Sequence, residues 1–171
     1  MGIITNIMER DGEPYLTRVK LMPHTRWGQL IVHRFHRGDK ESDTHDHRWD
    51  FWTFPLQDYL EVERRPHDGA LILSRVQAYR WHKRPKEHAH RVIGAYVNGD
   101  VNTVSQCLRR PSRHPDSPMR YPISVEMADA LYEQAKGRQF TTIVWRGPDT
   151  GTWGFWVGDQ WVPWQEYEYG R

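Results

Sequence analysis

Short segments that alternate apolar and polar residues recur along most of this chain, with turn residues between them roughly every ten positions. Such spacing favours an antiparallel β-barrel or jelly roll over a fold of alternating strands and helices. The clearest expected strands cover residues 15–21, 28–35, 44–54, 56–64, 70–76, 88–97, 140–145 and 152–157. The sequence therefore predicts an all-β fold.

One helix interrupts this pattern. Ser124 is a suitable N-cap, the apolar residues of 125–136 recur at helical spacing, and Gly137 can end the helix. The helix belongs to a segment, 98–139, whose first part is basic and rich in proline. We expect this segment to be an insertion into a single domain of residues 1–171, placed where it could act as a lid over one end of the barrel.

Composition excludes several classes of function. The 171 residues are enough for one domain with a real core, and 13% of them are aromatic, including nine Trp. A net charge of +2 gives no reason to expect nucleic-acid binding, and the single Cys107 excludes an internal disulfide and every Cys-based zinc motif. No stretch approaches the ~18 apolar residues of a membrane span and no signal peptide is evident, so a cytoplasmic location is expected.

Histidines supply the strongest indication of chemistry. His45 and His47 are two positions apart in an expected strand, so their side chains project from the same face. Two converging imidazoles suit a transition metal, and Asp50 could either bind it or hold one of the histidines in place. His90 is the best candidate for a third ligand, although His88 lies on the same face of its strand.

With these motifs in order, the chain resembles the cupin superfamily, and more narrowly the small bacterial and phage-type cupins. The resemblance rests on His33-Arg34-Phe35, on His45-Asp46-His47 with Trp49-Asp50-Phe51, on His90-Arg91-Val92, and on Gly147-Pro148 followed by Trp153-Gly154-Phe155-Trp156, Trp161 and Trp164. It implies a double-stranded β-helix with one metal ion, in which His45 and His47 match the ligands of the first motif and His90 matches that of the second.

The chain departs from the family pattern at one position. The glutamate that usually follows the second histidine by four or five residues is replaced here by Phe51 and Trp52. Asp50 follows His47 by three residues and is out of phase with it, so Asp50 needs a bulge or a strand end to reach the metal. The site is therefore either completed by Asp50 or made of three histidines, as in the thiol and aromatic-ring dioxygenase branches of the family.

These features make a metal-dependent enzyme the leading hypothesis. Three histidines favour Fe(II), with Mn, Ni, Zn or Co as alternatives, and the expected reaction is oxygenation of a small anionic or aromatic metabolite. Tyr59 and Arg91 join Asp50 as candidate catalytic residues, because Tyr59 lies on the next strand and an inward Arg34, Arg48 or Arg91 would bind an anionic group. A redox-neutral isomerase, epimerase or lyase, or a non-catalytic ligand-binding barrel, is the alternative, and the family analogy implies a homodimer.

Overall fold

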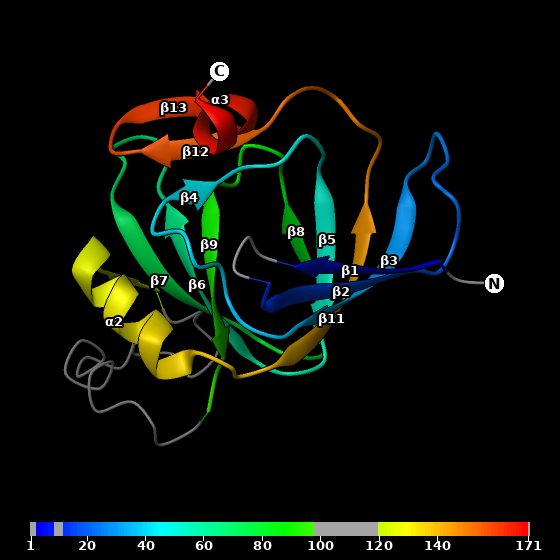
Figure 1. The fold of residues 1–171 in the computed structure, drawn as a ribbon, viewed down its shortest axis with the longest axis horizontal. Coiled ribbons are helices and arrows are strands. Elements are labelled where there is room, and N and C mark those ends of the chain that lie inside the picture. Colours follow the sequence, from blue (N-terminus) through cyan, green and yellow to red (C-terminus); the bar gives the residue numbers. More distant parts are fainter. Residues whose placement is uncertain (1–2, 9–11, 98–119, 171) are drawn as a thin grey trace.

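Two antiparallel β-sheets face each other in the computed structural model, which describes residues 3–8, 12–97 and 120–170 (Figure 1). The six-stranded sheet contains, in spatial order, β1 (Ile3–Met8), β2 (Pro14–Lys20), β3 (Gln29–Phe35), β11 (Phe140–Arg146), β5 (Phe51–Pro55) and β8 (His82–Arg84). The seven-stranded sheet contains β10 (Arg120–Pro122), β7 (Leu71–Val76), β6 (Tyr59–Arg64), β9 (His90–Ala95), β4 (Thr44–His45), β12 (Gly154–Val157) and β13 (Gln160–Pro163). The predicted all-β jelly-roll fold is confirmed.

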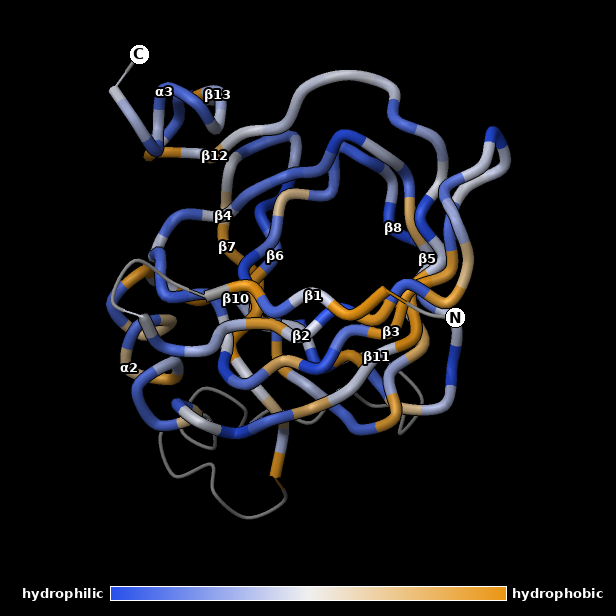
Figure 2. Tube along the Cα trace, turned by 45° about the vertical axis from the view of Figure 1, so that its right-hand side comes forward, coloured by the Kyte–Doolittle hydropathy of each residue, from blue (hydrophilic) through white to orange (hydrophobic). Residues whose placement is uncertain are grey.

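Strand register determines which side chains of the six-stranded sheet enter the barrel. Thr142 of β11 is paired with His33 of β3, and Val144 is paired with Thr53 of β5. Because alternate residues share a face, these side chains and Arg146, two positions further on, point to the same side of the sheet. Figure 2 shows how strongly the apolar residues gather on β3 and β11, at the centre of this sheet.

Strand β6 is buried on both faces. Leu60 and Val62 pack against the helix α2 (Val125–Ala135), whereas Tyr59 and Glu61 point to the interior of the barrel. The helix begins as predicted, because the Ser124 hydroxyl accepts a hydrogen bond of 3.3 Å from the backbone N–H of Met127. Within the described part of the chain, no helix is both long and apolar enough to cross a membrane.

The segment predicted to be a lid is described only from Arg120 onward. Its helix α2 covers the outer face of the seven-stranded sheet (Figure 1). Strand β10 extends the edge of that sheet beside β7. None of the described residues 120–139 lines the central cavity. Residues 98–119, which include the basic stretch, lie outside the described residues.

Two elements differ from the prediction. The single strand expected over 44–54 is two strands, β4 and β5, which belong to different sheets, because residues 46–50 cross from one sheet to the other. A short helix, α3 (Trp164–Tyr169), also follows β13 where no helix was predicted. Packing against β12 stabilises this helix, because Tyr167 stacks on Phe155 with the ring centroids 3.9 Å apart.

Candidate metal centre

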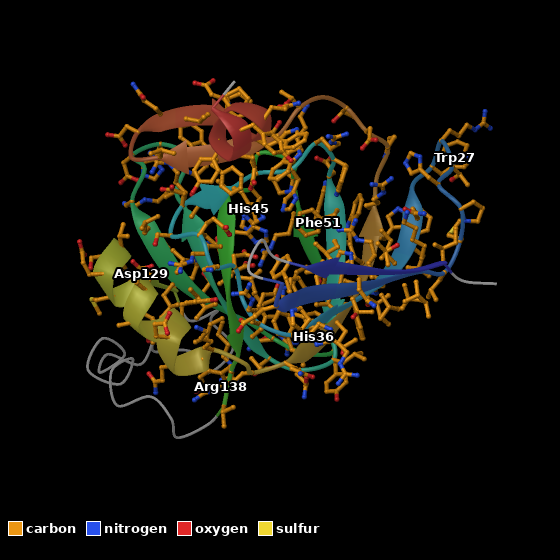
Figure 3. The ribbon with its side chains drawn as sticks, in the orientation of Figure 1. Trp27, His36, His45, Phe51, Asp129 and Arg138 are labelled. Atoms are coloured by element: carbon orange, nitrogen blue, oxygen red, sulfur yellow. The ribbon has the colours of Figure 1, made fainter. Side chains whose placement is uncertain are left out.

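Three histidines meet inside the barrel. His45, His47 and His90 each offer one ring nitrogen, and these three atoms all lie within 4.8 Å of one another. The closest pair is Nε2 of His47 and Nε2 of His90, 3.0 Å apart. Nitrogens that share one transition-metal ion at about 2.0–2.2 Å lie about 3 to 3.5 Å from each other, so the donor set fits such an ion with small adjustments. His45 is labelled in Figure 3.

Backbone pairing brings these residues together. His45 of β4 stands directly opposite His90 of β9, and its other neighbour is Phe155 of β12. His47 follows the end of β4, where its backbone N–H donates to the carbonyl oxygen of Lys86 at 3.0 Å. The two histidines therefore point inward as the His-x-His spacing predicts, although β4 contains only the first of them.

The residue between the two histidines explains how the second one is held. Asp46 points away from the cavity and accepts hydrogen bonds from the backbone N–H of Gly154 and from Nε1 of Trp161, both at 2.8 Å. The backbone N–H of Asp46 also donates to the Gly154 carbonyl at 3.1 Å. These hydrogen bonds attach the segment from His45 to His47 to the hairpin formed by β12 and β13.

Glu61 orients His90. Its side chain is fully buried, and its Oε2 lies 3.0 Å from Nδ1 of His90, while the Arg84 guanidinium binds its other oxygen. A carboxylate can only accept hydrogen bonds, so Nδ1 of His90 carries the proton and Nε2 presents its lone pair toward His47. This is the tautomer that a metal ligand requires, and a carboxylate behind the ligating histidine is a common feature of metal sites.

The charges in the barrel match this assignment. Burial would raise the pKa of Glu61, but Arg84 and the neighbouring histidines hold that pKa well below its usual range, so Glu61 is ionised. Burial lowers the pKa of His45 to about 4, against the opposing effect of Asp39, and burial together with the other histidines places the pKa of His47 well below its ordinary value. Both imidazoles are therefore neutral near pH 7, as ligation requires.

A second group shares His90. Glu61, His88 and His90 also place one donor atom each within 4.8 Å of the others. In this group, however, Glu61 is already bound to Arg84, and Nδ1 of His90 is already used by Glu61. His45, His47 and His90 line the central cavity, whereas Glu61 and His88 do not. The three-histidine group is thus the one that a substrate can reach.

The cavity in front of the histidines has a volume of about 410 Å³ and lies between the two sheets. Apolar and aromatic side chains form much of its wall, including Leu16, Phe35, Phe51, Val144 and Trp153. Its polar lining includes the three histidines and the arginines Arg18, Arg48 and Arg146. A small organic molecule could occupy this space and contact both.

The other predicted site residues are found in different places. Asp50 is exposed, and its Oδ1 accepts a hydrogen bond of 2.9 Å from the backbone N–H of Lys86, so the structure does not bring Asp50 to the three histidines. Arg91 is 1% exposed and donates to Asp129 of α2 at 2.6 Å, away from the cavity. Tyr59 does line the cavity, and its hydroxyl donates to Oε2 of Glu61 at 3.3 Å.

The three arginines that border the histidine motifs in the sequence, Arg34, Arg48 and Arg91, also lie in different places. Arg48 lines the cavity. Arg34 lies on the outer surface and donates to the Gln139 side chain at 2.9 Å, and Arg91 joins α2 to the barrel. The arginines that enter the cavity besides Arg48 are Arg18 and Arg146. Arg18 lies two residues after the apolar Leu16 in one expected strand, so the two share a face, and this spacing is the signal that could have identified Arg18.

Asp39 is a further buried carboxylate, and it was not among the predicted site residues. It accepts hydrogen bonds from the Tyr15 hydroxyl and from the backbone N–H of Val92 at 2.6 Å, and its Oδ2 lies 3.9 Å from Nδ1 of His45. The loop can approach β9 because residue 38 is glycine, where a Cβ atom would lie 2.3 Å from the Ile93 carbonyl oxygen. No sequence pattern marks this residue, because the contact is made only in the folded chain.

Comparison with known proteins bears on the fold alone. No protein-family model and no curated protein matches this sequence at a significant level. Among solved structures, the chain is similar to Rru_A2000 from Rhodospirillum rubrum, described as a cupin-2 domain, with 12% identity, 92% of this chain and 76% of that chain covered, and a TM-score of 0.50.

Two further solved structures are more distant. For the DMSP lyase DddQ from Ruegeria pomeroyi DSS-3, the identity is 12%, the coverage is 94% of this chain and 63% of that one, and the TM-score is 0.47. For the capsular polysaccharide assembling protein CapF from Staphylococcus aureus, the identity is 10%, the coverage is 95% and 31%, and the TM-score is 0.46.

The comparison with solved structures shows the fold of this chain. The chain has a cupin fold, which confirms the predicted resemblance at the level of architecture. Inside this fold, buried histidines and a buried glutamate form a cluster that could hold a metal ion. The narrower resemblance to small bacterial and phage-type cupins stays a prediction.

Proposed function

We propose that this protein is a metal-dependent enzyme in which His45, His47 and His90 hold one divalent transition-metal ion, Fe(II) in the first place, and that it oxygenates a small metabolite. The observation that carries the proposal is the arrangement of the three ring nitrogens within 4.8 Å of one another on the wall of a cavity. Imidazoles are the ligands that Fe(II) and related ions accept, and these three converge at the edge of a space for a ligand.

The residues around the histidines have defined tasks in this account. Glu61 holds the proton on Nδ1 of His90, so that Nε2 remains a lone-pair donor. Asp46 fixes the backbone between His45 and His47 from the opposite side. When bound, Fe(II) supplies a redox-active centre with open positions for substrate and O₂. Phe51 and Trp153 line the same cavity and reduce the access of water to that centre.

Metal content tests the first half of the proposal. The chelator-treated chain is reconstituted with Fe(II) under argon, desalted, and analysed for bound metal by mass spectrometry. We expect about one ion per chain in the wild type and a large loss in the His45→Ala, His47→Ala and His90→Ala variants. His67→Ala is the matched control, because His67 lies in a turn with a side chain that is 70% exposed. A folded wild-type chain that retains no metal would contradict the proposal.

Oxygen consumption tests the second half. The iron-loaded chain is mixed with a panel of small carboxylic and aromatic acids, and O₂ uptake is followed with an electrode. Substrate-dependent uptake that disappears in His47→Ala supports an oxygenase. Turnover of a substrate without O₂ uptake would contradict the oxygenase proposal. It would favour the redox-neutral alternative, an isomerase, epimerase or lyase in which the metal acts as a Lewis acid. Tight ligand binding without turnover would indicate a binding protein.

A further inference from the structure

The cavity contains more arginine than its carboxylates neutralise. Arg18, Arg48 and Arg146 line it, together with two acidic residues, Asp39 and Asp149. Asp39 is already bound by Tyr15 and by the backbone of β9, and Asp149 is exposed. Within the described part of the chain, neither Arg18 nor Arg146 forms an ion pair. Partly buried guanidinium groups without a carboxylate partner carry a desolvation cost that an anionic ligand would offset.

Arg146 is directed into the cavity by its place at the end of β11. It follows Thr142 and Val144 on the inner face of the sheet and is paired with Phe51 of β5. The Phe51 ring lies 4.7 Å from the ring of His47, measured between centroids, so Arg146 stands one strand away from the histidine cluster. The guanidinium carbon of Arg146 lies over the ring of Trp49, 4.5 Å from its centroid. Its Nε is buried and has no hydrogen-bond partner.

Arg18 approaches the same space from β2. Its Nε donates to Nε2 of His33 at 3.1 Å, so His33 is a neutral acceptor that holds this guanidinium in place. Burial lowers the pKa of Arg18, and the positive charge of Arg146 lowers it further. Arg18 and Arg146 line the same cavity and carry like charges, so an anion bound within reach of both would reduce the repulsion between them.

The remainder of the cavity is suited to an apolar molecule. Ile7, Leu16, Phe35, Val92 and Val144 contribute aliphatic or aromatic surface. We propose that Arg18 and Arg146 bind the carboxylate of a small substrate with an apolar, flat body, and that this body extends toward His45, His47 and His90. The inference rests on the proposed function for what happens at the histidines, but the arginine site itself involves only residues of this chain and no metal.

Binding is measured by titration calorimetry on the full chain after chelator treatment, with benzoate as the probe. Benzamide serves as the neutral molecule of the same shape, and inorganic phosphate as an anion without an apolar body. The variants are Arg18→Gln and Arg146→Gln, with Arg18→Lys and Arg146→Lys as milder second variants that keep the charge. Arg34→Gln is the matched control, because Arg34 lies on the neighbouring outer face and pairs with Gln139. Circular dichroism and melting temperature establish that each variant is folded.

We expect benzoate to bind the wild type and Arg34→Gln alike, and at least about tenfold more weakly to each Gln variant, with Lys variants in between. Benzamide and phosphate should bind much more weakly than benzoate. The proposal is overturned if the wild type does not bind benzoate, or binds it no more tightly than benzamide or less tightly than phosphate. It is also overturned if the folded Arg18 and Arg146 variants bind benzoate as tightly as the wild type. The calorimetry uses metal-free chain, so its outcome is independent of the Fe(II) reconstitution. A chain that shows arginine-dependent binding but takes up no Fe(II) on reconstitution would contradict only the proposed function. A chain that takes up Fe(II) but shows no such binding would contradict only this inference.

Discussion

Nδ1 of His90 lies 3.0 Å from Oε2 of Glu61, a carboxylate that is completely buried and bound on its other side by Arg84. This contact determines which ring nitrogen of His90 carries the proton. It leaves Nε2 as a lone-pair donor 3.0 Å from Nε2 of His47. The proposed metal centre therefore depends on a residue that does not itself line the cavity.

Replacement of Glu61 should damage both metal binding and stability. Glu61→Gln keeps the shape but removes the charge, so the tautomer of His90 is no longer imposed and Arg84 loses its counter-ion. We expect a 10- to 100-fold loss of Fe(II) affinity, measured by competition with a chromophoric chelator, and a loss of about 3 kcal/mol in the free energy of unfolding, measured with urea.

Glu133→Gln is the control for this change, because Glu133 is exposed on α2. Its removal should alter the free energy of unfolding by less than about 0.5 kcal/mol and leave metal affinity unchanged. If Glu61→Gln bound Fe(II) as tightly as the wild type, Glu61 would have no part in orienting His90.

His88 provides a test of which histidine group binds the metal. Nε2 of His88 lies 3.6 Å from Oε1 of Glu61, which is beyond hydrogen-bond length, and His88 does not line the cavity. We expect His88→Ala to keep one Fe(II) per chain, by the same metal analysis that finds none in His90→Ala. Equal loss in both variants would move the site to Glu61, His88 and His90.

Sequence patterns predicted the elements that depend on local physics. Alternation identified most of the strands, and Ser124 marked the start of α2. The prediction of one strand over 44–54 was wrong. Alternation continues through residues 46–50 in the sequence, but the change of sheet there depends on contacts with distant segments. One such contact is the hydrogen bond from the backbone N–H of Gly147 to the carbonyl oxygen of Asp50. The helix α3 has six residues and no side-chain N-cap, so it leaves no recognisable signal.

The site was predictable only in part. The spacing of His45 and His47 and the motif around His90 predicted a cluster that the fold does bring together. Glu61 and Asp39 were not identified as partners of these histidines, because they reach them through strand pairing that no local pattern encodes. Arg146 lies one residue beyond the strand expected over 140–145, so its direction follows only from the register of β11 against β5. The metal-binding role of the three histidines stays a prediction.

Asp46 and Trp161 should be energetically coupled. The Asp46 carboxylate accepts from Trp161 Nε1 at 2.8 Å, and this bond ties the histidine segment to β13. In a double-mutant cycle of Asp46→Asn and Trp161→Phe, urea unfolding should give a coupling energy of about 0.5 to 1.5 kcal/mol. Asp43→Asn with Trp161→Phe is the control pair, because Asp43 binds Tyr167 instead, and it should be additive. Additivity in both cycles would show that this hydrogen bond has no energetic role.

Acid should destabilise the metal-free chain through His33. Burial, with the charges of Arg18 and Arg146, lowers the pKa of His33 to about 3, whereas the ordinary value of 6.5 applies once the chain is unfolded. Between these values the unfolded chain binds more protons, so stability decreases as the pH falls from about 6.5 toward 3, by up to about 1.4 kcal/mol per pH unit for this group.

Urea unfolding at about pH 7 and about pH 5 measures this loss. In His33→Gln the loss should be smaller, though not zero, because the pKa of His45 is lowered to about 4 and it contributes with the same sign. Glu61 adds to the loss only at lower pH, since its pKa lies well below the usual range. An unchanged difference between the two pH values in His33→Gln would exclude His33 as a source.

Anomalous diffraction at the iron absorption edge, from crystals of the Fe(II)-reconstituted chain, tests the central claim most directly. The account predicts one anomalous peak in the barrel, within about 2.2 Å of one ring nitrogen from each of His45, His47 and His90. A peak between Glu61, His88 and His90, or no peak in the barrel at all, would contradict it.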